Sequence, residues 1–74
     1  MSNIYIIMEK VDLGGDPVIA YIDESEAVYA CANKNIYDKQ QHAQALLNLG
    51  YTQEMVNERV VYREQFYVQE VSLK

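Results

Sequence analysis

The hydrophobic residues of this chain gather in short runs near its beginning and its end. Residues 4–11 are rich in β-branched and aromatic side chains, which suit a pleated sheet. The run is almost wholly apolar through Met8, so it predicts a central strand. Residues 12–17 contain Gly-Gly and Asp, which favour a turn, and residues 18–22 predict the return strand of a hairpin. Pro17 cannot donate to a ladder, which favours an edge position for this strand.

The middle of the chain carries helical signals. Asp23 is placed to cap the free amides of a helix, and Glu26 stands three residues later, as in a capping box. Residues 27–32 place small apolar side chains at helical spacing, which predicts a face that lies close on the sheet. Asn-Lys-Asn at residues 33–35 predicts the end or interruption of this helix.

A second helical stretch is predicted over residues 36–49, with Gly50 at its end. Its apolar side is expected to include Ile36. A short third helix is an option for residues 52–58, with the threonine at its start as N-cap and a hydrophobic staple onto the next turn. Residues 60–62 and 66–73 are then expected to form the last strand, bent or bulged between them.

These elements predict one α+β domain over residues 1–74, of ββα(α)β order, with residues 36–58 as a helical insertion. The last strand returns beside the first, which gives a three-stranded antiparallel sheet of order 2-1-3. Two or three helices are expected to pack on one face. The other face and the two edges stay open, and these are routes to a homodimer or to a partner's strand.

Composition narrows the class of protein. The chain has 74 residues, a net charge of -5, seven tyrosines and a single cysteine. One cysteine allows no internal disulfide, which favours a reducing compartment. The first residues lack the basic region of a secretory signal, and no apolar run reaches the roughly 20 residues of a membrane span. We therefore expect a soluble, cytoplasmic protein without membrane association.

A stretch of the chain from residue 12 to residue 26 holds five carboxylates and no Lys or Arg. Nucleic-acid binding relies on Lys and Arg that neutralise phosphates, so direct binding of DNA or RNA is not expected. The stretch has two interpretations, a solvated acidic surface that aids solubility or a patch that docks a basic protein. The five carboxylates are those of Asp12, Asp16, Asp23, Glu24 and Glu26.

Tyrosines supply most of the aromatic surface, because the chain has one Phe and no Trp. Tyr29 and Tyr37 lie away from the predicted apolar face of their helices, and both are therefore expected to be exposed. With Asp38 and the acidic stretch they form a candidate acidic and aromatic contact surface, since Tyr is enriched at interfaces. The alternative is a set of scattered single exposures.

No catalytic or metal-binding constellation is predicted. Cys31 lies among alanines, where a free cysteine is usually a small core side chain. His42 is the only histidine, and no orienting or oxyanion motif accompanies a Cys–His pair. Asp12 and Asp16 flank two glycines but lack the alternating ligands of a calcium loop. We expect no enzyme activity, no cofactor and no metal.

Both ends of the chain resemble small phage and bacterial domains of unknown function. The similarity rests on the hairpin at residues 4–22, the helix start D-x-x-E-A at residues 23–27 and the closing Y-x-x-E-x-x-L at residues 67–73. It covers both ends, while residues 36–58 depart from the short form. Small acidic phage proteins often inhibit host systems, restriction and CRISPR nucleases among them. The resemblance implies such a role without naming the target.

The leading hypothesis is a non-enzymatic protein-binding module, phage-encoded, that inhibits or modulates a host protein by docking on its basic surface. Carboxylates and tyrosines would make the contact, and an anti-CRISPR-like role in the host cytoplasm is one form of it. The alternative is a self-assembling, homodimeric accessory protein without an external target.

Overall fold

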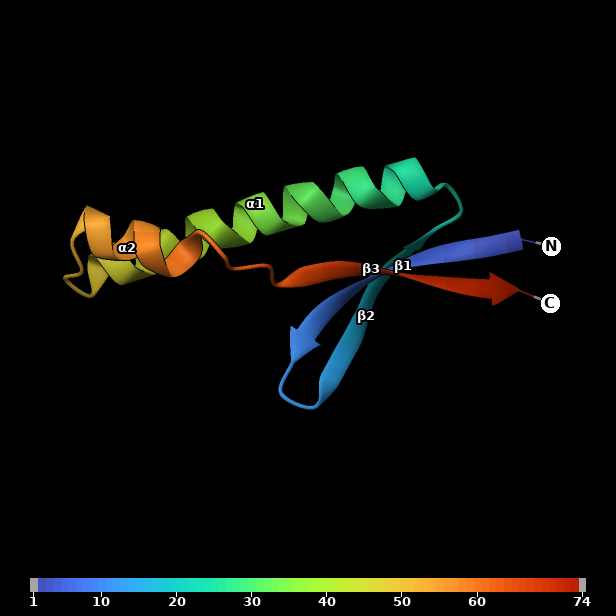
Figure 1. Ribbon diagram of the computed structural model, residues 1–74, viewed down its shortest axis with the longest axis horizontal. Coiled ribbons are helices and arrows are strands. Elements are labelled where there is room, and N and C mark those ends of the chain that lie inside the picture. Colours follow the sequence, from blue (N-terminus) through green and yellow to red (C-terminus); the bar gives the residue numbers. More distant parts are fainter. Residues whose placement is uncertain (1, 74) are drawn as a thin grey trace.

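The computed structural model describes residues 2–73, which form a three-stranded antiparallel sheet and two helices (Figure 1). The strand order is β2-β1-β3, so the predicted α+β fold and its 2-1-3 sheet are confirmed. The elements are β1 (Ser2–Val11), β2 (Gly14–Tyr21), α1 (Glu24–Asn48), α2 (Gln53–Val60) and β3 (Phe66–Leu73).

The β1–β2 hairpin is tighter than the sequence predicts. Its strands are joined by Asp12 and Leu13 alone, and Gly14 has a φ of 139°, a conformation that side chains disfavour. The residues from Gly14 to Pro17, expected in the loop, belong to β2 instead. Pro17 does lie in an edge strand, opposite Met8, and the register shifts between Ile7 and Met8.

Helix α1 runs without a break through the Asn-Lys-Asn segment, so the predicted interruption at residues 33–35 is wrong. The Asn35 side chain donates to the carbonyl oxygen of Phe66 at 3.0 Å and accepts from its amide at 2.8 Å. Lys34 Nζ lies 5.8 Å from the centre of the Phe66 ring. These polar residues therefore join the helix to the start of β3 and do not end the helix.

The short third helix predicted near residues 52–58 is present as α2. The Thr52 hydroxyl accepts from the amide of Met55 at 3.2 Å, as an N-cap does. The strand predicted over residues 60–62 is wrong, because Val60 ends the helix and the Val61 amide still bonds to the carbonyl of Asn57. The bend expected within the last strand is a turn outside it: residues 61–65 precede β3, whose register with β1 is regular.

Buried side chains form two separate groups. We call Ile7, Ala27 and Cys31 the sheet core, where the first half of α1 lies on the sheet; Leu46 and Val56 are the hairpin core, between α1 and α2. Only α1 covers the sheet, and α2 packs on the second half of α1 (Figure 1). The radius of gyration is 15.0 Å, against about 11 Å for a compact chain of this length.

Candidate protein-interaction surface

The acidic start of α1 combines a structural and an exposed part. Asp23 is the N-cap, and its Oδ1 accepts from the amide of Glu26 at 3.1 Å. Glu24 and Glu26 lie in the first turn, where their charges oppose the positive end of the helix dipole. All three side chains are exposed. The sequence predicts this cap correctly, and the carboxylates of Glu24 and Glu26 lie at the surface beside it, without an ion pair among residues 2–73.

Next to this acidic start, α1 exposes apolar side chains that no other element covers. We define the outer helix face as Ser25, Val28, Tyr29, Ala32 and Ile36. Val28, Tyr29 and Ile36 are 53%, 72% and 54% exposed. The first four of these residues and Glu24 line an open depression. The exposure of Tyr29 agrees with the prediction, whereas Ile36 was expected on the apolar side of its helix.

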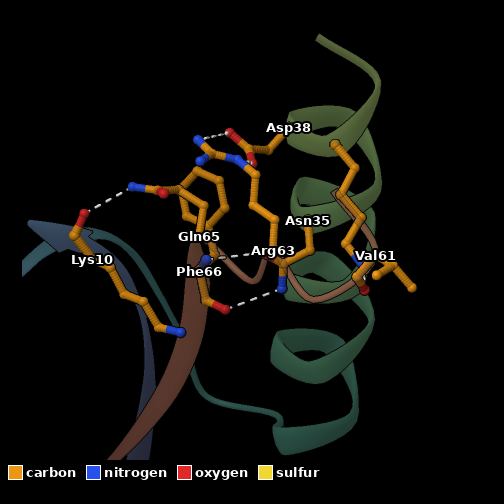
Figure 2. Close-up of polar contacts among 8 residues, drawn as sticks. Lys10, Asn35, Asp38, Val61, Arg63, Gln65 and Phe66 are labelled. Carbon is orange, nitrogen blue, oxygen red and sulfur yellow. Dashed lines mark hydrogen bonds and ion pairs between the residues drawn. The ribbon is translucent and has the colours of Figure 1, made fainter. Parts of the chain in front are cut away.

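Tyr37 and Asp38 lie on another flank of α1. They line a second depression with Asn33, Lys34, Gln41 and Phe66. Tyr37 is 64% exposed, as the sequence predicts. Figure 2 shows why Asp38 differs: both of its oxygens accept from Arg63, at 2.6 Å from Nε and 3.3 Å from Nη2. Its charge is therefore paired inside the molecule. The ion pair joins α1 to the segment between α2 and β3.

Asp12 and Asp16 lie far from the start of α1. Asp12 is in the hairpin turn, and Asp16 pairs with Glu9 across the β1–β2 ladder. At about 3.3 Å per strand residue, Asp16 is roughly 20 Å from Asp23 at the other end of β2. The acidic stretch, continuous in sequence, is thus two acidic clusters in space.

Tyr62 is the most exposed tyrosine, at 91%. Sequence reasoning missed it, because the residues around it were assigned to a strand. It lies instead in the turn after α2. The only sequence signal that favours a turn over a strand at Tyr62 is the run of polar residues that follows it.

Cys31 and His42 do not form a pair. Both are on α1, eleven residues apart, which separates them by about 16 Å along the helix axis. Burial raises the pKa of the Cys31 thiol, and the nearby negative charge of Glu64 raises it further, while Lys34 opposes both. The thiol is thus held in its protonated, poorly nucleophilic form. Within residues 2–73 there is no group of three or more side chains suited to a metal ion.

Comparison with known proteins gives no match, whether to family models, to curated proteins or to solved structures. In the part of the chain that the structure describes, neither helix is long and apolar enough to cross a membrane.

Proposed function

We propose that this protein is a non-enzymatic binding module that docks on a basic protein surface through the start of α1 and the outer helix face. The observation that carries this proposal is the exposure of Val28, Tyr29 and Ile36 in one row, directly beside the free carboxylates of Glu24 and Glu26. Aromatic and aliphatic anchors next to charges are the usual make-up of an interface.

The charge of this surface selects the class of partner. Glu24 and Glu26 have no cation paired with them among the ion pairs of residues 2–73, whereas Asp38 has Arg63. Acidic groups at the rim of an interface mainly steer association with a positively charged partner. The resemblance to small phage domains that the sequence patterns suggest implies a host protein as that partner, and inhibition or modulation of it as the result.

The two acidic clusters provide a matched test. Glu24→Lys/Glu26→Lys alters the start of α1, and Asp12→Lys/Asp16→Lys alters the hairpin turn by the same total charge. The chain, immobilised on beads, is incubated with a bacterial lysate at low and high salt, and retained proteins are identified and quantified. We expect the wild type and the Asp12→Lys/Asp16→Lys variant to retain a basic protein. The Glu24→Lys/Glu26→Lys variant should not retain it, and high salt should release it.

Tyr29→Ser tests the apolar part of the same surface. Removal of a central aromatic anchor should weaken binding of the retained protein roughly tenfold or more. Circular dichroism of each variant verifies that α1 is intact, since lysines in the first turn oppose the helix dipole. A retained protein that binds all variants equally, or that is lost only with Asp12→Lys/Asp16→Lys, would refute this docking surface.

A further inference from the structure

The side of the sheet away from α1 is apolar, and its apolar side chains are half-buried except that of Leu73, which is 43% exposed. Ile7 points toward the helix, so its neighbours in β1 point the other way, and the cross-strand pairs extend this side to β3. Within residues 2–73, α1 is the one helix in contact with the sheet, and Figure 1 shows no helix on this other side. We define the open sheet face as Ile4, Ile6 and Met8 of β1 with Tyr67, Val71 and Leu73 of β3.

The contacts around Gly15 place β2 on the same surface. A Cβ at Gly15 would collide with Tyr67 Oη and come within 3.2 Å of Met8 Cε. The tyrosine of β3 therefore reaches across β1 and lies over the glycine of β2. This fills the gap that a glycine leaves in a sheet and makes the face continuous over three strands.

The chain exposes more surface than a compact protein of its mass. Its accessible surface is 5625 Å², whereas a compact protein of this mass exposes about 4,700 Å². The excess of about 900 Å² accompanies the extended shape, with its radius of gyration of 15.0 Å, and a standard interface would cover roughly 800 Å² on each partner.

Charge favours a second copy of this chain as the partner. The outward positions of β1 and β3 on this side carry no Asp or Glu, and their polar members are Lys10 and Gln69 with Ser2 at the end. Two copies of a chain with a net charge of -5 can therefore meet here without opposing carboxylates. A basic protein would find no acidic group on this face to attract it.

Each edge of the sheet is obstructed for strand pairing at one place. In β2, Pro17 has no amide to donate and the register is irregular beside it. In β3, the amide and carbonyl of Phe66 are already bonded to the Asn35 side chain. We propose that the chain forms a two-fold symmetric homodimer in which the open sheet faces of two copies pack on one another, as the sheets of a β-sandwich do.

The full-length chain is examined by light scattering on a sizing column and by sedimentation over a wide concentration range. We expect twice the chain mass of 8.6 kDa. Ile6→Glu places a carboxylate on the face of each copy and should weaken the dimer at least about 100-fold, because like charges brought together cost several kcal/mol. Ile36→Glu, on the outer helix face, is the matched control and should leave the dimer unchanged.

Cross-linking provides a second readout that does not depend on the stability of a core variant. Gln69→Cys and Gln40→Cys each add one exposed thiol, the first on the open sheet face and the second on α1. A short bismaleimide should join two Gln69→Cys copies and not two Gln40→Cys copies. A monomer at every concentration, a dimer lost with Ile36→Glu and kept with Ile6→Glu, or selective linkage through Gln40→Cys would each overturn the proposal.

Discussion

The two ends of the molecule differ in how their cores are made. At one end, three strands and half a helix bury Ile7, Ala27 and Cys31; at the other, two helices bury Leu46 and Val56. The sheet core joins elements far apart in sequence, whereas the hairpin core is local. The contrast shows that α1 belongs to both ends. Its middle, near Asn35, is bonded to the start of β3 and therefore connects the two cores.

Core truncation should give the largest effect and test whether the ends unfold together. Ile7→Ala is expected to cost about 3–4 kcal/mol, because Ile7 is fully buried, and Val56→Ala about 2 kcal/mol. Denaturant unfolding measures both values. Hydrogen exchange should show that Val56→Ala accelerates exchange mainly in α2 and the second half of α1. If both variants accelerated exchange equally along the whole chain, the two ends would form one cooperative unit.

The junction between the ends should be the next most sensitive place. Asn35→Ala removes both side-chain bonds to the backbone of Phe66 and leaves these groups without a partner, which should cost about 2 kcal/mol. Asn33→Ala, on the exposed side of the same helix, is the control and should change the free energy of unfolding little. Equal losses in the two variants would mean that helix propensity, and not the junction, sets the effect.

The two helix caps allow the ends to be compared through the same kind of contact, a side-chain oxygen that accepts from the amide three residues later. Asp23→Ala removes the cap of α1 at the sheet end, and Thr52→Ala removes the cap of α2 at the hairpin end. Each should cost about 1 kcal/mol if its helix is formed only in the folded state. A much smaller loss for Thr52→Ala, by thermal unfolding, would indicate that α2 frays in the native protein.

The smallest expected effect is the pH dependence from Cys31. Burial raises its pKa in the folded state, so the folded chain keeps the thiol proton after the unfolded chain has lost it. Stability from this group is therefore complete below the ordinary thiol pKa of about 8.5 and declines as the pH rises above it. Cys31→Ala should remove this alkaline decline when unfolding is followed at successive pH values. An unchanged decline would assign it to other groups.

The sequence predicts much of the fold correctly. The central strand, the caps at Asp23 and Thr52, the strand order and the exposure of Tyr29 and Tyr37 all follow from spacing and side-chain type. It fails where a distant partner decides. Asn35 has a low preference for helix interiors, and its bonds to Phe66, 31 residues away, help to hold it inside the continuous α1.

The candidate site shows the same limit. Charge along the chain marks all five carboxylates of the acidic stretch alike, but β2 carries the chain away between Asp16 and Asp23. The length of a strand therefore separates the two clusters. Asp38 looks free in sequence because Arg63, its partner, is 25 residues away. Which carboxylates are available thus depends on topology, which a charge count does not contain.

The unbroken α1 also constrains how this chain can change length during evolution. Each residue inserted into the middle of the helix would rotate everything after it by about 100°, which would move Leu46 away from its contacts. Insertions of about seven or eleven residues, near whole numbers of turns, keep the same side in place. Even these would lengthen the helix by roughly 10 Å or more, so the return segment before β3 would have to grow with it. Length changes in related chains should therefore occur in coupled pairs, one in α1 and one in the return segment between α1 and β3.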